Sequence, residues 1–345
     1  MSTRLALAAL LLAPLAAQAQ TAAAPLAAAV PPTAEEMVNG MEASGGGARP
    51  GLRRSGAKGV CAAGEWVSTG AGARLSTAAN LRAGVRLPVV ARFAVTGGNP
   101  ATPDTAPGGR GLSFSMEAPG GEPHEFVLLN APVFGSGSLQ SFIDGTRART
   151  PDPATGRVNA EALAAAVASH PDWAAQPAWY AANPPPASFA TSPFFGVNSF
   201  VFAAPDGTRR HLRWTFEPVA GRVALTPEER QSRGPNFLQD ELRTRVAQAP
   251  AEWRVLLVIP QAGDPLLDAT KAWPADRETV EVARLRITSV SAGGTPVVAG
   301  APAPGPCEPV MFNPLLLPAG IEPSDDPILL ARAETYAISL SRRLQ

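Results

Sequence analysis

Two residues near the C-terminus, Arg332 and Tyr336, have the types and spacing that could stabilise a phenolate. They are four residues apart, so a helix would place both side chains on one face. A free tyrosine has a pKa of ~10, and a phenolate at neutral pH therefore needs a nearby cation or metal ion. The arginine supplies such a charge, and a ferric iron would lower the pKa further. The spacing alone is also typical of a surface arginine beside a partly buried tyrosine.

A second unusual run is "GLRRSGAKG", residues 51–59, which holds three cations among small residues. A phosphate-binding loop needs lysine directly after its second glycine and a hydroxyl residue after the lysine. Here Ala57 separates Gly56 from Lys58, and Gly59 follows the lysine, so the run does not match such a loop. The whole chain carries 29 basic and 29 acidic side chains. This balance gives no indication of a nucleic-acid or membrane-surface partner.

The first 19 residues are typical of a signal peptide for export. Arg4 is followed by an apolar run over residues 5–17 and by small residues that end at Ala19. This order of regions predicts cleavage after Ala19 and a periplasmic or secreted protein. No later segment has the roughly 18 uninterrupted apolar residues that a membrane-spanning helix needs, so no membrane span is expected.

The mature chain is expected to begin with a tether and to continue as one domain. Residues 20–50 are rich in Ala, Pro and Gly and are expected to form a tether with one short helix. Thr33 and Glu36 form a capping-box pattern that predicts this helix over residues 34–43. Residues 51–345 are expected to form a single domain.

Within the domain, short β-rich runs separated by Gly, Pro, Asn and Asp favour an antiparallel sheet or barrel. Ala-rich and capped helical segments interrupt and follow these runs. The sequence therefore predicts an α+β fold, with a β core, helical insertions and a C-terminal helix. The expected strands lie within residues 60–67, 86–95, 111–117, 124–130, 198–219, 252–260 and 280–290, and the expected helices within 159–170, 172–183, 225–250 and 324–345.

The chain has two cysteines, Cys61 and Cys307, which lie far apart in the sequence. In an oxidising compartment they could pair as a disulfide. Two separate buried thiols would fit the same sequence. The sequence leaves both arrangements open.

The segment around Arg332 and Tyr336 resembles the haem-ligand region of the catalases. The family pattern is F-x-P, then P-x-G-I-E-x-S-x-D, then R-x-F-x-Y. Upstream, "DPLLDATKAWP" is similar to the family's N-P-F-D-x-T-K-x-W-P. The resemblance extends from about Arg53 to Leu344 and implies a catalase-like antiparallel β-barrel with a C-terminal haem-ligand helix. The residues in register with the first pattern are Phe312, Pro314, Pro318, Gly320, Ile321, Glu322, Ser324, Asp326, Arg332 and Tyr336.

The resemblance also implies a haem b cofactor and the residues that contact it. The signal peptide and the short chain indicate the smaller exported subfamily, the catalase-related peroxidases. Arginine suits the haem propionates because its planar fork pairs with carboxylates, and tyrosine is the family's iron ligand. The implied haem contacts are Arg53, Arg92 and Arg343 at the propionates, Phe142 against the ring, and Arg332 beside the iron ligand Tyr336.

The chain departs from the family on the opposite side of the haem. The family's R-x-x-H-A-K-G matches Arg53, Ala57, Lys58 and Gly59, but Gly56 stands where the distal histidine is expected. That histidine is the family's acid–base residue, which moves a proton from one peroxide oxygen to the other. Three other family positions also differ: Ala94 replaces a serine, Leu129 falls at an asparagine, and Asn198 replaces the histidine of G-x-H-x-F.

The three histidines of the chain offer no convincing replacement for the distal imidazole. His170 is expected to cap a helix C-terminus or to face solvent. His211 lies among arginines on an expected strand and is expected to be exposed. His124 precedes Asn130 by six residues on another expected strand, and this separation spans roughly 20 Å at ~3.3 Å per residue.

These features predict an exported haem peroxidase that acts on hydrogen peroxide or organic hydroperoxides and draws on an unidentified electron donor. Loss of a positioned acid–base catalyst costs roughly 10²- to 10⁴-fold in rate, so attenuated turnover is expected. One alternative is a non-catalytic exported protein of catalase fold that binds, carries or senses haem. Another is a catalase-fold barrel that no longer binds haem. Gly56 is the residue that separates the first two hypotheses.

Overall fold

The computed structural model of the protein describes residues 30–295 and 305–345. Residues 32–345 form one compact unit, and residues 1–31 belong to a separate unit. The predicted signal peptide, residues 1–19, lies outside the described residues, as does the first part of the expected tether. No helix in the described ranges has the length and apolar character needed to cross a membrane.

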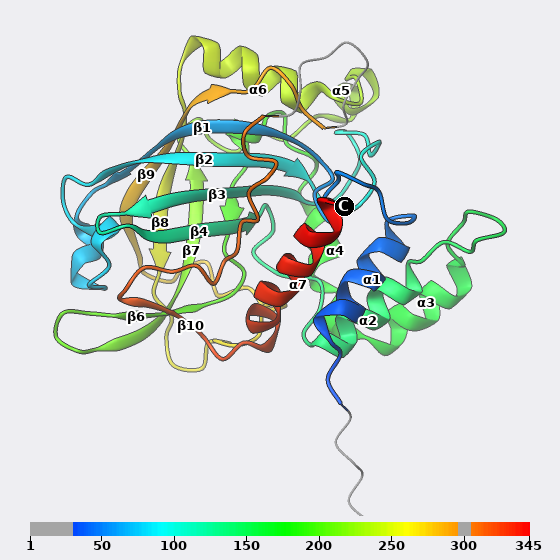
Figure 1. Ribbon diagram of the computed structural model, residues 1–345, viewed down its shortest axis with the longest axis horizontal. Helices are drawn as coiled ribbons and strands as arrows, with labels where there is room; N and C mark the ends of the chain where they lie inside the picture. The colour runs from blue at the N-terminus through cyan, green and yellow to red at the C-terminus, as the bar shows by residue number, and fades with distance from the viewer. Residues whose placement is uncertain (1–29, 296–304) are drawn as a thin grey trace, which may run out of the picture. The chain divides into compact units, whose positions relative to one another are not determined.

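Eight antiparallel strands of the described chain close into a β-barrel (Figure 1). Strands β1 to β4 pair in chain order, and β9 and then β8 continue the sheet from the other edge of β1. The short β5 joins β4 to β7, and the pairing of β7 with β8 closes the ring. This confirms the predicted α+β fold with an antiparallel barrel. The barrel strands are β1 (Lys58–Ser68), β2 (Arg86–Val95), β3 (Arg110–Ala118), β4 (Glu122–Leu129), β5 (Phe194–Phe195), β7 (Arg209–Pro218), β8 (Ala251–Val258) and β9 (Thr279–Val290).

Two further short strands extend the sheet beside β7. Strand β6 (Phe200–Ala203) pairs with β7 in a hairpin. The turn of this hairpin contains the predicted Pro-Asp-Gly sequence, and Gly207 adopts a φ of 85° there. Strand β10 (Ile321–Pro323) pairs with β6 and comes shortly before the C-terminal helix.

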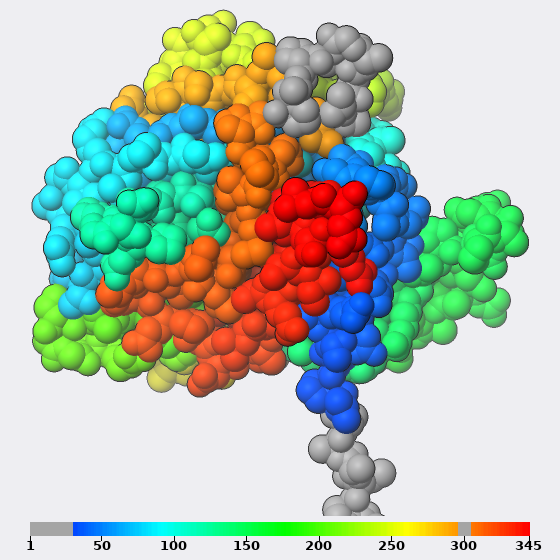
Figure 2. Space-filling view, in the orientation of Figure 1, coloured from blue at the N-terminus to red at the C-terminus, as the bar shows by residue number. Residues whose placement is uncertain are grey.

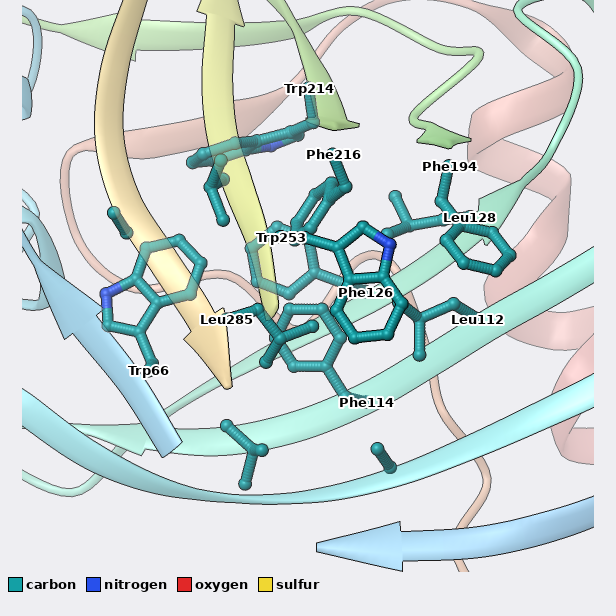
Figure 3. Packing of buried hydrophobic residues seen from close by; sticks show 14 of the residues in the cluster. Trp66, Leu112, Phe114, Phe126, Leu128, Phe194, Trp214, Phe216, Trp253 and Leu285 are labelled. Atoms are coloured by element: carbon teal, nitrogen blue, oxygen red, sulfur yellow. The ribbon is translucent and has the colours of Figure 1, made fainter. Parts of the chain in front are cut away.

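Aromatic and aliphatic side chains fill the interior of the barrel (Figure 3). The rings of Phe114 and Phe126 stack with their centroids 4.4 Å apart. Successive residues of a strand point to opposite faces of the sheet. On β2, Phe93 therefore belongs to the barrel core, whereas Arg92 and Ala94 face the other side of the sheet, where they line a cavity.

Three helices pack against one another beside the barrel (Figure 1): α1 (Ala34–Ser44), α2 (Leu139–Ala148) and α7 (Pro327–Arg343). Figure 2 shows α7, in red, between α1, in blue, and the segment that follows residue 305, in orange. The predicted capping box starts α1, because the Thr33 hydroxyl accepts the N–H of Glu36 and the Glu36 carboxylate accepts that of Thr33. Helix α2 was not predicted; Ser138 caps its N-terminus.

The remaining helices differ in detail from their predictions. The single helical segment expected over residues 225–250 is two helices, because Gly234 and Pro235 separate them and proline cannot donate a backbone hydrogen bond. The segment expected over 172–183 begins as a 3₁₀ turn before α4. These elements are α3 (Ala160–Ser169), α4 (Ala175–Ala182), α5 (Pro227–Ser232) and α6 (Phe237–Gln248), with 3₁₀ turns η1 (Ala71–Arg74), η2 (Ala79–Leu81), η3 (Pro171–Trp173) and η4 (Phe189–Thr191).

A disulfide joins Cys61 on β1 to Cys307, with Cα atoms 5.4 Å apart. Of the two arrangements that the sequence leaves open, the structure therefore has the paired one. The bond holds the start of the segment leading to α7 against the barrel wall, and Phe312 packs beside it.

Candidate functional site

A cavity of about 250 Å³ lies between the outer face of strands β2, β3 and β4 and the helices α1, α2 and α7. It brings together side chains from distant parts of the sequence. Gly56, at the expected distal position, lines this cavity. So do all six residues predicted to contact the cofactor: Arg53, Arg92, Phe142, Arg332, Tyr336 and Arg343.

The predicted pair on the last helix is in direct contact. Asp326 caps the N-terminus of α7 by accepting the N–H of Ile328 at 2.9 Å, and Pro327 occupies the first helical position. One turn of helix then separates Arg332 from Tyr336. The guanidinium donates two hydrogen bonds to the phenolic oxygen, from Nε at 3.1 Å and from Nη2 at 2.7 Å. These two charge-assisted hydrogen bonds hold the phenolic oxygen in place at the cavity.

Asn198 holds this arginine from the other side. The Arg332 Nη1 donates to the Asn198 Oδ1 at 3.0 Å, and the Asn198 Nδ2 donates to the Asp326 Oδ2 at 2.7 Å. A guanidinium can only donate and a carboxylate can only accept, so the contacts determine the orientation of the amide. Asn198 is buried. Asn198 thus links the cap of α7 to the arginine that binds Tyr336.

The three arginines predicted for the propionates gather around one carboxylate, Glu308. The Arg92 Nε donates to the Glu308 Oε1 at 2.8 Å, and the Arg53 Nε lies 3.4 Å from its Oε2. Arg92 also donates from Nη1 to the carbonyl oxygen of Gly56 at 2.7 Å. Arg343, at the end of α7, is 6% exposed and makes no side-chain hydrogen bond or ion pair with a residue that the structure describes.

Burial and like charge act together in this arginine cluster. Burial, together with repulsion from Arg92 and Arg343, lowers the pKa of Arg53 to about 9, although Glu308 opposes the shift. Burial would raise the pKa of Glu308, but the three guanidinium groups outweigh this effect and hold that pKa below its usual range. The carboxylate is therefore ionised at neutral pH, and the cluster keeps an excess of positive charge.

Phe142 reaches the cavity from α2, with Phe134 beside it. The two rings are nearly parallel, with centroids 6.2 Å apart and planes inclined by 8°. Both line the cavity. An aromatic ring that lines a cavity suits packing against a flat aromatic ligand.

Gly56 adopts a backbone conformation that favours glycine. Its φ is 66°, in the left-handed region. A Cβ atom at this position would lie 3.2 Å from the Cβ of Ala94 and 3.6 Å from the Arg92 Nη1. A side chain at residue 56 would therefore meet both backbone strain and a close neighbour.

None of the chain's histidines lines the cavity. His124 is buried, with its Nδ1 3.1 Å from the amide nitrogen of Asn80, and burial lowers its pKa to about 3. His170 is the C-cap residue of α3, as expected. His211 is partly buried instead of exposed, because the pairing of β7 with β6 brings the Ser199 hydroxyl to 3.1 Å from its Nδ1.

Two features of the site were not predicted. Glu308 follows Cys307 directly in the sequence, and nothing in the single sequence connects it with three distant arginines. Asn198 was recognised as a departure from the family but not as a hydrogen-bonding link. The one available signal for Glu308 was its place beside a cysteine and four residues before Phe312 of the family pattern.

Residues 51–345 match the family model described as catalase. The chain belongs to the catalase family. Among curated relatives in this family, a catalase-related peroxidase of Synechococcus elongatus is 39% identical over 298 residues, which cover 86% of this chain and 85% of the relative. A catalase-related peroxidase of Mycolicibacterium paratuberculosis is 32% identical over 303 residues, covering 86% and 91%.

Solved structures agree on the catalase fold. A fungal catalase and a bacterial catalase each superpose with a TM-score of 0.74 at 20% sequence identity over 86% of this chain. The chain covers 60% and 58% of their respective lengths.

Catalase family proteins bind haem, and the donor set of this cavity fits that group. Tyr336 offers a phenolic oxygen backed by a guanidinium, a donor that suits ferric iron. At the other end of the cavity, the Arg53 Nη1 makes no hydrogen bond with a described residue, and the buried Arg343 has no described side-chain partner. Buried donors of this kind with positive charge suit carboxylates. The residues present are therefore compatible with haem.

Proposed function

We propose that the protein is a catalase-related peroxidase of the small exported subfamily. It would use haem b and act on hydrogen peroxide or organic hydroperoxides, with a separate electron donor as reductant. One observation carries the proposal: the Arg332–Tyr336 pair and the buried arginine cluster line the same cavity. Similarity to two catalase-related peroxidases over most of the chain supports the same activity.

Each side chain has a defined task in this proposal. Haem, when bound, would supply the iron at which the peroxide O–O bond is broken. The phenolic oxygen of Tyr336 would hold that iron, and Arg332 would stabilise the negative charge on the oxygen through its two hydrogen bonds. The arginine cluster would bind the propionates, and Phe142 would pack against the ring.

Attenuated turnover belongs to the proposal. Gly56 stands at the position of the distal histidine, and the described residues that line the cavity include no histidine and no carboxylate. A positioned acid–base group typically contributes about 10²- to 10⁴-fold to the rate. Without one, a water molecule would have to carry the proton between the two peroxide oxygens.

The same observation favours one alternative, a non-catalytic haem-binding, haem-carrying or sensing protein of catalase fold. The iron ligand and the propionate site would remain intact in such a protein. The residues around Gly56 would then only enclose a ligand. The two functions differ in peroxide turnover and agree on haem binding.

A spectrum and a peroxide assay on one sample test these proposals together. The mature chain is reconstituted with haem, its Soret band is recorded, and peroxide consumption is measured with and without a phenolic electron donor. We expect a Soret band and slow, donor-dependent consumption. A Soret band without turnover would favour the alternative function, and no Soret band would exclude both.

Two tyrosine variants test the iron ligand, since the chain has only two tyrosines. Tyr336→Phe is expected to abolish the ferric spectrum of the wild type. Tyr180→Phe is the matched control, because Tyr180 does not line the cavity. Equal loss in both variants, or no loss in either, would show that Tyr336 is not the ligand.

Export is part of the same proposal, with residues 1–19 as the cleaved signal. The disulfide supports it, because disulfides persist mainly in oxidising compartments. Expression of the full chain in a bacterial host should yield a periplasmic protein that starts at Gln20. An uncleaved chain in the cytoplasmic fraction would contradict this part of the proposal.

A further inference from the structure

Glu308 is a protein carboxylate placed among the arginines that would receive the carboxylates of a ligand. It forms ion pairs with Arg92 at 2.8 Å and with Arg53 at 3.4 Å. Its Oε1 also lies 3.4 Å from the hydroxyl of Thr295. With 20% of its side chain exposed, Glu308 lies at the edge of the cluster and is not sealed within it.

The carboxylate divides the arginines into two kinds. Each of the three nitrogens of Arg92 donates once within the protein: Nε to Glu308, and the two terminal nitrogens to the carbonyl oxygens of Gly56 at 2.7 Å and Ala57 at 3.4 Å. Arg53 uses Nη2 on three backbone carbonyl oxygens and Nε in the ion pair with Glu308, whereas its Nη1 donates to no residue that the structure describes. Arg343 makes no hydrogen bond or ion pair with a described side chain. The donors left for a ligand therefore belong to Arg53 and Arg343.

The net charge of the cluster matches a ligand with two carboxylates. Three guanidinium groups and one carboxylate give three positive charges minus one, which leaves two. An anion that carries two carboxylates would neutralise this excess. Without Glu308 the excess would be three, and a buried site would then keep an uncompensated cation after a dianion had bound.

The disulfide and backbone hydrogen bonds fix the position of Glu308. Cys307 is held to β1 by the disulfide, and Arg92 is the residue paired with Cys61 across β1 and β2. The carbonyl oxygens of Cys307, Glu308 and Val310 all accept from Arg53. A carboxylate held this firmly before the ligand arrives costs little conformational entropy on binding.

We propose that Glu308 is a positioning residue that sets the charge selectivity of the cavity. It pairs with Arg92 and with the Nε of Arg53, and it leaves the Arg53 Nη1 and Arg343 as the two binding groups for a ligand with two carboxylates. This inference rests on the proposed function, because it takes haem as the ligand. It differs from the resemblance, which gives all three arginines the same role.

The test compares two ligands that differ only in their carboxylates. Haem and haem dimethyl ester are titrated, in the same detergent, into the ligand-free mature chain, and binding is followed by tryptophan fluorescence quenching. The preference for haem over the ester is the ratio of the two dissociation constants. We expect Glu308→Gln to increase this preference about tenfold, because it removes a negative charge beside the bound carboxylates. Arg343→Gln and Arg53→Gln should each decrease it to a similar extent.

Two further variants separate positioning from simple charge. Arg92→Gln should change the preference less than Arg343→Gln, because every nitrogen of Arg92 already donates to a group of the protein. Glu322→Gln is the matched control, since Glu322 pairs with Arg209 outside the cavity and should leave the preference unchanged. Thermal unfolding of each ligand-free variant checks that it is folded.

The possible results separate this inference from the proposed function. An unchanged preference in Glu308→Gln, or equal effects of Arg92→Gln and Arg343→Gln, would overturn the inference while haem binding and peroxide turnover stand. Haem binding with the expected preference but no peroxide consumption would overturn the peroxidase function and support the role of Glu308. If Glu308→Gln does not fold, the comparison of Arg92→Gln with Arg343→Gln still decides the outcome.

Discussion

Asn198 joins Arg332 to Asp326 by one hydrogen bond to each residue, at 3.0 Å and 2.7 Å. Asp326 also caps the helix that carries Arg332 and Tyr336. A single buried amide thus connects the start of α7 to the group that binds the phenolic oxygen. The link needs a side chain that donates at one end and accepts at the other, which a neutral amide can do without a change of protonation.

Asn198→Asp is expected to destabilise the protein by about 2–3 kcal/mol, because it replaces the donor that faces Asp326 with a second carboxylate oxygen. Chemical denaturation of the ligand-free chain measures this change. Asn130→Asp is the matched control, because the Asn130 Oδ1 accepts the N–H of Arg110 at 2.7 Å and aspartate keeps that acceptor. Equal losses in the two variants would show that the amide donor of Asn198 contributes nothing.

Gly56→Ala is expected to lower the free energy of unfolding by about 1–2 kcal/mol from its left-handed backbone alone. The contact of the new Cβ with Ala94 should add to this loss. Gly84→Ala provides the reference, since Gly84 has a φ of 77° and a Cβ atom added there would meet open space. Adding Ala94→Gly to Gly56→Ala should recover only the part of the lost unfolding free energy that comes from the contact with Ala94. If Gly56→Ala matches wild type in stability, the backbone assignment at residue 56 is wrong.

Removal of the disulfide by Cys61→Ala with Cys307→Ala is expected to cost several kcal/mol of stability. The two cysteines are 246 residues apart, and cross-linking such a long loop restricts the unfolded chain by about 5 kcal/mol in the loop-entropy model. Thermal unfolding with and without a reducing agent measures the loss. The reducing agent should lower the melting temperature of the wild type and leave that of the double variant unchanged.

His124 should make the stability of the protein sensitive to acid. Its folded-state pKa is lowered to about 3 by burial, against ~6.5 in an unfolded chain. The unfolded state therefore binds the proton more readily, so the stability contributed by the neutral ring is present above pH ~6.5 and is lost as the pH falls toward 3.

This loss should reach a few kcal/mol at the acid end, since each unit of pKa shift corresponds to ~1.4 kcal/mol. Urea denaturation from pH 7 to pH 4 should show a smaller fall in stability for His124→Gln than for the wild type. His170→Gln, at the C-cap of α3, is the histidine control. Parallel pH profiles for the wild type and His124→Gln would contradict the prediction.

The barrel could be predicted because its signals are local. Alternating apolar residues and turn residues mark the strands, and the capping boxes at Thr33 and Thr226 mark helix starts. The pair Arg332 and Tyr336 could be predicted for the same reason, since one helical turn determines their contact. The roles of the more distant residues came only from family resemblance.

The rest of the site depends on contacts between distant segments. Glu308 meets Arg92 across 216 residues of sequence, and Asn198 meets Asp326 across 128. No periodicity in a single sequence reports such contacts. The ends of α5 and α6 and the partial burial of His211 were missed for a related reason, because each depends on how neighbouring segments pack.

The Cys61–Cys307 bond encloses most of the chain in one covalent ring. A protease that cuts a single exposed peptide bond within this ring, for instance in the exposed stretch 152–162 before and into α3, would not release a fragment. The two pieces would stay attached through sulfur, and they would separate on a gel only after reduction. In an extracellular setting the protein could thus be nicked there without losing any part of its barrel.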